Sequence, residues 1–246
     1  QELTLLAEVC LGFAVDKARK STADKHGKAA ARFAVLALGK FAGRELGYGS
    51  DLDLVFVYEA NVPIKSGVSP IEYFTAVASN IMRTLEEPTK YGQLYDVDAR
   101  LRPDGNKGSL VVSDARLTQY YLDEAQAWER LALVKIRAVG GDAAFAARVE
   151  EQARALAFTL PLTRENLDTI EDIRAKLATA SSPLGLKKSE GGLAELEFAV
   201  RLLQLKYAKK DPDVTLRDVL GALEALPCAG AITEADATTL RETYLL

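Results

Sequence analysis

Hydrophobic and polar residues follow two different spacings in the first half of the chain. Leu3, Leu6, Cys10 and Phe13 recur at helical spacing and predict an N-terminal helix. A polar stretch at 20–28 is expected to break it. A second amphipathic helix covers about 71–85. An unbroken apolar run at 33–38 and alternating segments at 52–58 and 94–102 predict three strands. The first half is therefore predicted to mix helices with strands.

The second half keeps helical spacing after a turn at 103–106 and a short strand predicted at 109–112. Gly140 and Gly141 are expected to end one helix, and Asp142 is expected to cap the next. Further helices are predicted after a cap at Thr163 and at about 192–209, 215–226 and 234–245. We therefore expect an α+β chain that ends in an all-helical part.

These two parts are expected to form two domains, one with a mixed sheet over 1–140 and a helical bundle over 141–246. Hydrophobic residues make up 48% of the 246 residues, and no apolar run approaches the roughly 20 needed to cross a membrane. The net charge of −4 gives no basic field for nucleic acid. Cys10 and Cys228 have no ligand-like spacing, so a cytoplasmic protein is expected. Because it starts at Gln1, the chain is expected to be processed or part of a longer one.

Two aspartates open the alternating strand at 52–58. Asp51 and Asp53 share one face, with side chains roughly 6–7 Å apart at a rise of about 3.3 Å per residue. Two unpaired carboxylates at this spacing repel each other, so the arrangement is typical of a cation site. Mg²⁺ prefers such oxygen ligands, and two Mg²⁺ ions can stabilise the attacking and leaving oxygens of a displacement at phosphorus.

The second alternating segment offers a third carboxylate. Asp98 shares its face with Asp96, Arg100 and Arg102. If this segment lies beside the first, Asp98 joins the pair of aspartates, and the two arginines add positive charge near a triphosphate. The ordinary structural alternative is that these arginines only neutralise aspartates on a solvated sheet face.

A glycine-rich segment precedes the first aspartate. Its glycines let backbone N–H groups approach phosphate closely, and Lys40 can reach a phosphate oxygen. A lone D-x-D pair is common by chance, and the glycines can mark an ordinary mobile loop. Gly-Ser directly before D-x-D on a strand, with a second acidic strand later, favours the functional interpretation.

Four segments together resemble the glutamine synthetase adenylyltransferase family. They keep the order of that family, at 38–54, 95–105, 128–142 and 190–198, and include GSDLDL, DVDARLRP, WER, KIR and GGLAELEF. Full-length members of this family carry two catalytic halves, of which this chain resembles one. The resemblance implies a polymerase-β-like nucleotidyltransferase fold followed by a helical bundle.

The resemblance also implies roles for single residues. By position, the catalytic metal ligands are Asp51, Asp53 and Asp98. Gly39 and Ser50 match positions near the nucleotide phosphates, and Lys135 and Arg137 match a basic pair near the substrate. With the residues singled out above, the predicted nucleotide site comprises Gly39, Lys40, Gly49, Ser50, Arg100, Arg102, Lys135 and Arg137.

The implied activity is Mg²⁺-dependent transfer of an adenylyl group from ATP to a tyrosine of glutamine synthetase, or its phosphorolytic removal by inorganic phosphate. Glutamine synthetase is the implied partner, with a PII-type signalling protein as a further one, and neither nucleic acid nor a membrane is expected. The DVDARLRP sequence is more similar to the half that transfers the adenylyl group. At position 195 that half more often has Asp, so Glu195 is more similar to the half that removes it.

Two other functions stay open at this point. One is nucleotidyl transfer to another substrate, above all uridylyl transfer to a small regulatory protein, whose enzymes share a similar G-S-D-x-D opening. The segments at 128–142 and 190–198 argue against it. The other is a non-catalytic nucleotide-binding regulatory module, against which the intact aspartates argue. Dependence of nucleotide binding on Mg²⁺ distinguishes catalytic from degenerate copies.

Overall fold

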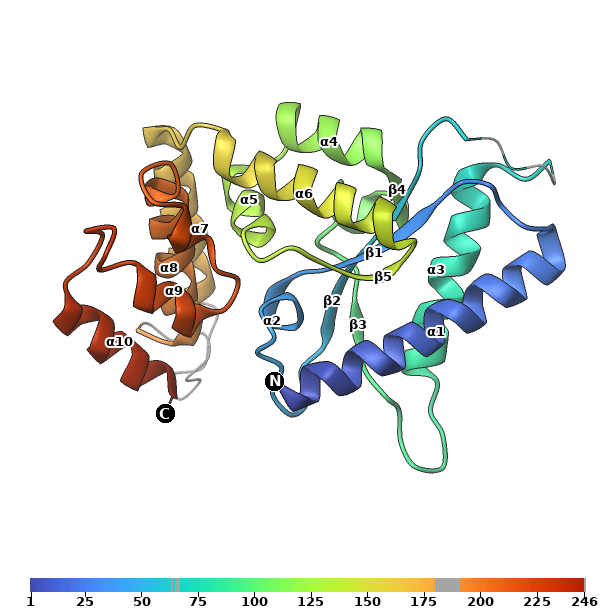
Figure 1. Cartoon of the computed structure of the whole chain (residues 1–246), viewed down its shortest axis with the longest axis horizontal. Helices are drawn as coiled ribbons and strands as arrows, with labels where there is room; N and C mark the ends of the chain where they lie inside the picture. Colours follow the sequence, from blue (N-terminus) through green and yellow to red (C-terminus); the bar gives the residue numbers. More distant parts are fainter. Residues whose placement is uncertain (63, 65–66, 180–190, 246) are drawn as a thin grey trace. The chain divides into compact units, whose positions relative to one another are not determined.

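The computed structural model describes residues 1–62, 64, 67–179 and 191–245 (Figure 1). It divides into two compact units. The first contains Gln1–Glu124 and Ile136–Ala153, and the second contains Ala125–Lys135 and Arg154–Leu246. Helix α6 (Ala143–Thr159) contributes to both units, so a single domain boundary near residue 140 stays a prediction.

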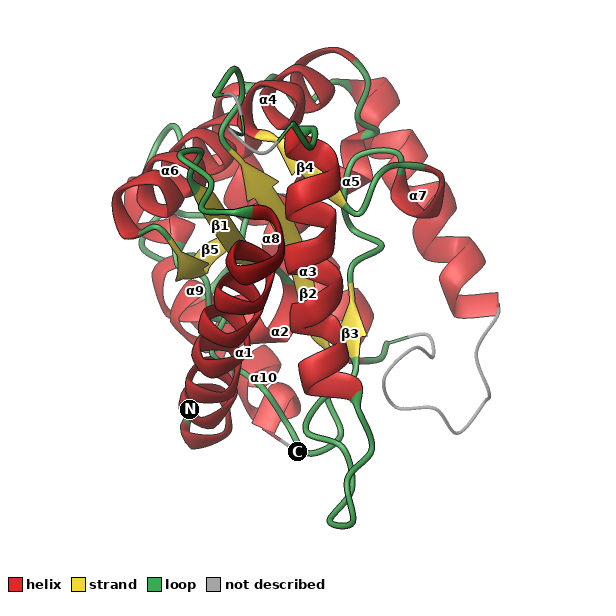
Figure 2. Ribbon diagram, turned by 90° about the vertical axis from the view of Figure 1, so that its right-hand side faces the viewer, coloured by secondary structure: helices red, strands yellow, loops and turns green. Residues whose placement is uncertain are grey.

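A mixed sheet forms the centre of the first unit, and Figure 2 shows its strands in yellow. Its strands are β1 (Phe33–Ala37), β2 (Leu52–Tyr58), β3 (Val97–Asp98), β4 (Val111–Ser113) and β5 (Arg137–Gly141). Strand β1 pairs antiparallel with β2 and β5, whereas β2 pairs parallel with β3 and β4. The predicted α+β class with a mixed sheet is confirmed.

Helices bury small or apolar faces against this sheet. The helices of the first unit are α1 (Glu2–His26), α2 (Gly39–Ala42), α3 (Pro70–Glu86), α4 (Asp114–Asp123) and the start of α6. Helices α1 and α3 pack side by side (Figure 1). Helix α3 begins with a capping box, in which Ser69 and Glu72 satisfy each other's backbone N–H groups. Its apolar face, including Phe74 and Ile81, joins β1 and β2 in one core.

The N-terminal helix differs from its prediction in length and in its buried face. It runs through the polar stretch to His26 and ends at Gly27, whose φ of 77° suits a helix terminus. Leu6 and Phe13 are 56% and 64% exposed. The buried face instead carries mostly small residues, namely Ala7, Leu11, Ala14, Val15 and Ala18. Of the predicted residues, Leu3 and Cys10 pack against the core, whereas Leu6 and Phe13 do not. Small side chains let α1 lie close to its neighbours, so hydrophobicity alone gave only part of the buried face.

Two further local predictions are wrong. Gly140 and Gly141 end no helix, because both belong to strand β5. Gly141 has a φ of +96°, and a Cβ there would lie 2.1 Å from the carbonyl oxygen of Phe33, so a close backbone approach requires glycine. Asp142 then precedes α6, and its carboxylate accepts the backbone N–H of Phe33 at 2.8 Å. The alternating segment at 94–102 forms a strand only at Val97–Asp98.

The second unit is helical throughout its described residues. It contains α5 (Ala127–Leu133), α7 (Arg164–Thr179), α8 (Leu193–Tyr207), α9 (Val219–Ala225), α10 (Glu234–Leu245) and the end of α6. Thr163 and Thr233 cap α7 and α10 as predicted. The helix predicted from 215 begins only at Val219, where the Asp218 side chain caps it by accepting the backbone N–H of Gly221. Buried Gln204 donates to the carbonyl oxygens of Val214 and Leu216 in the preceding loop. Among the described residues, no helix combines the length and apolar character that a membrane crossing requires.

Arg130 holds the end of α6 in the second unit. Its guanidinium, in a side chain only 6% exposed, donates to the carbonyl oxygens of Ala157, Leu160 and Pro161. We expect Arg130→Met to lower the free energy of unfolding by about 2–4 kcal/mol, because buried carbonyl groups lose charged donors. Urea unfolding measures this free energy. The control is Arg116→Met, which removes a more exposed ion pair with Glu124 and should change the free energy of unfolding little. Equal losses in both variants would contradict this role.

Candidate metal and nucleotide site

Three carboxylates converge where β2 and β3 run side by side. Asp53 and Asp98 are directly paired in the parallel register, and the backbone N–H of Leu52 donates to the carbonyl oxygen of Asp96 at 2.9 Å. Asp51 immediately precedes β2. One oxygen from each of Asp51, Asp53 and Asp98 lies within 4.8 Å of the others. The structure therefore brings the three predicted metal ligands together.

Arg100 balances the charge of these carboxylates. Its Nε lies 2.9 Å from both oxygens of Asp98, and its backbone N–H donates to the same carboxylate at 2.8 Å. The side-chain hydrogen bonds from Arg100 lower the pKa of Asp98 below its ordinary value. Asp98 in turn raises the pKa of Arg100, with smaller contributions from Asp51 and Asp53. Arg100 and Arg102 thus offset part of the charge of the three carboxylates.

The donor set fits a hard divalent cation. All three side chains offer carboxylate oxygens, the ligand type that Mg²⁺ prefers, and Asp98 is held in its ionised form. Asp53 also lies against the backbone at the start of α2. The Leu38 N–H donates to the Asp53 carbonyl oxygen at 3.0 Å, and Gly39 follows directly. Gly39 has a φ of +55°, and a Cβ there would lie 2.1 Å from Oδ2 of Asp53.

The glycine-rich segment leads from α2 to the first aspartate. Lys40 is half-buried within α2. The Gly47 N–H donates to Oγ of Ser50 at 3.2 Å, which shapes the turn before Asp51. Gly49 has a φ of +69°, and a Cβ there would meet nothing within 4 Å. Glycine at this position is therefore explained by its backbone conformation and not by crowding.

A cleft of about 420 Å³ opens beside the carboxylates. Asp51, Asp98, Arg100 and Arg102 line it, as do Met82 and Leu110. Arg102 is also part of the wall structure, because it donates to the carbonyl oxygens of Ala99, Ser109 and Gly108. Burial lowers its pKa below the ordinary value. Met82 and Leu110 were missed, because in the sequence they look like ordinary core residues of a helix and a strand.

The two basic residues of the KIR segment lie in different units. Arg137, at the start of β5, donates through Nε and Nη2 to the carbonyl oxygens of Ala42 and Phe41, both at 2.9 Å. Lys135 belongs to the second unit and is 1% exposed. Its Nζ lies 3.8 Å from Oε2 of Glu197, which also binds Arg201 at 2.7 Å. Lys135 is therefore part of a buried ion cluster.

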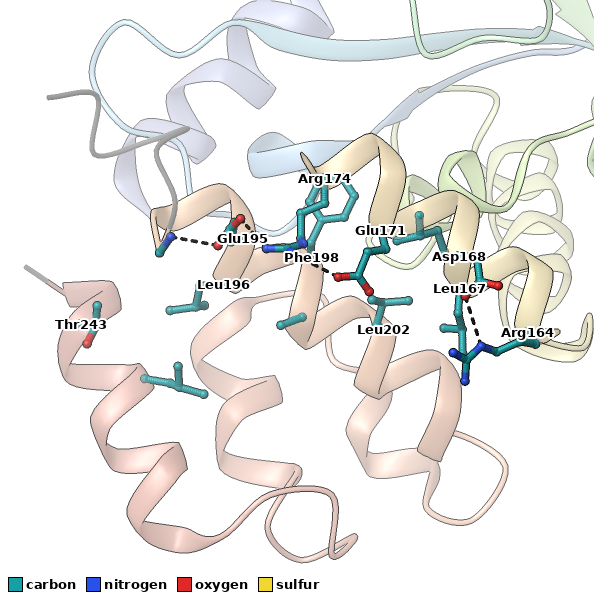
Figure 3. Close-up of a pocket in the computed structure, with 14 residues that line it drawn as sticks. Arg164, Leu167, Asp168, Glu171, Arg174, Glu195, Leu196, Phe198, Leu202 and Thr243 are labelled. Atoms are coloured by element: carbon teal, nitrogen blue, oxygen red, sulfur yellow. Dashed lines mark hydrogen bonds and ion pairs between the residues drawn. The ribbon is translucent and has the colours of Figure 1, made fainter. Parts of the chain in front are cut away.

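A second pocket, of about 640 Å³, lies among α7, α8 and α10 (Figure 3). Arg174 extends between Glu171 and Glu195 and lies 2.7 Å from the nearer oxygen of Glu195. The other Glu195 oxygen accepts the N–H of Gly191 at 2.9 Å. Within the described part of the GGLAELEF segment, Glu195 is thus an ion-pair partner on the wall of this pocket. Glu190 lies outside the described residues.

Comparison with known proteins agrees with a nucleotidyltransferase-type fold around this site. Residues 1–152 match the family model of glutamate-ammonia ligase adenylyltransferase, GlnE. Residues 164–246 match the model of GlnD PII-uridylyltransferase. The chain belongs to the glutamate-ammonia ligase adenylyltransferase family, and its nucleotidyltransferase-type domain is followed by a helical region.

Several curated relatives carry the same name, bifunctional glutamine synthetase adenylyltransferase/adenylyl-removing enzyme. Those of Stenotrophomonas maltophilia, Xanthomonas campestris and Hahella chejuensis are 34%, 38% and 35% identical to this chain, over 98%, 91% and 99% of its length. The matches cover 27%, 25% and 28% of these relatives. The chain thus spans about a quarter of their length.

Proposed function

We propose that the first unit catalyses metal-dependent transfer of an adenylyl group to a tyrosine of glutamine synthetase, or its phosphorolytic removal. The observation that carries this proposal is the convergence of Asp51, Asp53 and Asp98, in the part of the chain that matches the adenylyltransferase model. The names of the curated relatives support glutamine synthetase as the partner. The co-substrate is ATP in one direction and inorganic phosphate in the other.

The carboxylates would hold two Mg²⁺ ions at the edge of the cleft, with Asp98 binding one of them. Bound ions would neutralise charge on the phosphate oxygens and on the entering and leaving oxygens. The chain itself mainly positions these groups. Gly39, Lys40, Gly49 and Ser50 are proposed to approach the phosphates from the glycine-rich segment, and Arg100 to approach them from the cleft.

The remaining basic residues of the predicted nucleotide site have structural contacts that fit a supporting role. Arg102 shapes the cleft wall, Arg137 holds α2, and Lys135 lies in the ion cluster of the second unit. The free thiols of Cys10 and Cys228 fit the proposed cytoplasmic setting.

Uridylyl transfer is the rival activity, since residues 164–246 match the PII-uridylyltransferase model. That match contains none of the three converging aspartates, which all lie within residues 1–152. It therefore concerns the helical region and not the transfer site. It does support a PII-type signalling protein as a second partner of the chain.

The test is a pair of parallel assays on the chain with Mg²⁺. One contains unmodified glutamine synthetase and ATP labelled in its adenylyl group, and the other contains adenylylated glutamine synthetase and inorganic phosphate. We expect either label transfer in the first or ADP release in the second, and loss of either signal with EDTA. Silence in both assays with a folded chain would overturn the proposal. A matched assay with labelled UTP and a PII-type protein tests uridylyl transfer.

A further inference from the structure

Arg137 connects three elements of the first unit. On the sheet it lies opposite Ala37 of β1, and Ala37 stands two residues before Gly39. Its Nε and Nη2 donate to the two carbonyl oxygens at the end of α2, and its Nη1 lies 2.7 Å from Oε1 of Glu8 on α1. The guanidinium also lies 5.7 Å from the centroid of the Phe41 ring. The side chain is 12% exposed, so these contacts are largely shielded from water.

Helix α2 is short, and two kinds of contact fix it. Phe41 and Ala42 are buried in the core, and Arg137 binds the carbonyl oxygens at its end. The helix has only four residues, Gly39–Ala42, and therefore few internal hydrogen bonds. Its first residue, Gly39, lies directly against the carboxylate of Asp53. A displacement of α2 by a fraction of an ångström changes the space in which the Asp53 carboxylate sits. The guanidinium of Arg137 and the proposed metal ligand are thus linked through one short helix.

We propose that Arg137 is a positioning residue, which fixes α2 and through Gly39 holds Asp53 in its metal-binding orientation. This inference rests on the proposed function, because it assumes that Asp53 binds a divalent cation. The geometry of the contact requires arginine. Two adjacent carbonyl oxygens match the planar fork of a guanidinium, whereas a lysine offers a single point charge and cannot hold both at once. Residues hydrogen-bonded directly to a metal ligand commonly affect metal affinity about 10–100-fold. Arg137 acts one step further out, so we expect an effect at the lower end of that range.

The deciding measurement is binding of Mn²⁺ without nucleotide, followed by the electron paramagnetic resonance of the free ion. We expect Arg137→Lys to weaken Mn²⁺ binding about tenfold, because the fork is lost although the charge remains. Arg137→Gln combined with Glu8→Gln should show a similar loss, and it leaves no unpaired carboxylate at Glu8. The double variant keeps the test valid if a single variant folds poorly.

The matched control is Arg19→Gln. Arg19 also joins α1 to Asp142, the residue after β5, at 3.1 Å, and within the described part of the chain its hydrogen bond and ion pair go to Asp142 and not to α2. It should lose some stability while Mn²⁺ affinity stays unchanged. In the catalysed reaction, we expect Arg137→Lys to change kcat more than the KM for nucleotide, because the effect passes through the metal ligand.

The outcomes separate this inference from the proposed function. If the unaltered chain binds no Mn²⁺, the metal site itself is wrong. If it binds Mn²⁺ and Arg137→Lys binds it equally well, the positioning role is wrong. A variant whose nucleotide-free Mn²⁺ affinity is unchanged but whose ATP affinity falls would identify Arg137 as a direct phosphate ligand instead.

Discussion

Asp53→Asn is expected to lower turnover roughly 10³-fold or more, which corresponds to several kcal/mol of activation barrier. Asp53 stands at the pairing point of β2 and β3, directly opposite Asp98, and contributes one of the three converging oxygens. Asparagine keeps the size of the side chain but removes its charge, so the site loses cation affinity without losing its shape. The rate in the productive assay with saturating Mg²⁺ measures this effect.

Asp96→Asn is the matched control for this variant. Asp96 lies on the same segment as Asp98, is exposed, and accepts a hydrogen bond from Gln93 at 2.6 Å, but it is outside the group of converging carboxylates. We expect its turnover to stay within a few fold of the unaltered chain. Near-normal turnover in Asp53→Asn, with urea unfolding unchanged in both variants, would contradict the assignment of the metal ligands.

The converging carboxylates could be predicted because strand periodicity is a local property. Residues two apart on a strand share a face, so the D-x-D pair placed two carboxylates together without knowledge of the fold. That the segment with Asp98 lies beside β2 was only an assumption in the sequence analysis. The structure shows this pairing, with Asp53 directly opposite Asp98. Most of the longer helices and the β1 and β2 strands were predicted for the same local reason.

The contacts of Arg137 could not be predicted from the sequence. Its acceptors are carbonyl oxygens of Phe41 and Ala42, 96 and 95 residues away, and main-chain carbonyl groups carry no sequence signature. The same holds for Gly141, whose strand conformation depends on the backbone of β1 lying close to it. The KIR and GG segments were therefore visible as motifs, but their physical roles follow only from tertiary contacts.

The buried face of α1 shows a second limit of sequence patterns. Apolar periodicity favoured Leu6 and Phe13, which are exposed, over Ala7 and Ala14, which are fully buried. Hydrophobicity scales rank large side chains first, whereas close packing of α1 beside α3 requires small ones. A helix was predicted correctly at this position, although it is longer than expected. The face that it presents to the core depends on the shape of its neighbours.

Gly39→Ala is expected to lower turnover about 100-fold or more, because a displacement of about 1 Å at a reacting group has that effect. Two separate faults combine at this position. Alanine is strained at a φ of +55°, and its Cβ would lie 2.1 Å from Oδ2 of Asp53. The Asp53 carboxylate must then move away from Asp51 and Asp98, or α2 must move away from the strand. Turnover and Mn²⁺ affinity should fall together.

Gly27→Ala tests the backbone strain without the contact between Cβ and Asp53. Gly27 has a φ of +77° at the end of α1, and a Cβ there would meet nothing within 4 Å. Alanine is strained at a positive φ, so Gly27→Ala should lose about 1–3 kcal/mol of unfolding free energy, and Gly39→Ala should also be destabilised. Only Gly39→Ala should lose Mn²⁺ affinity and turnover. If Gly27→Ala reduced turnover as strongly, the loss would reflect general instability. Loss of Mn²⁺ affinity in Gly39→Ala alone would report the contact between Gly39 and Asp53.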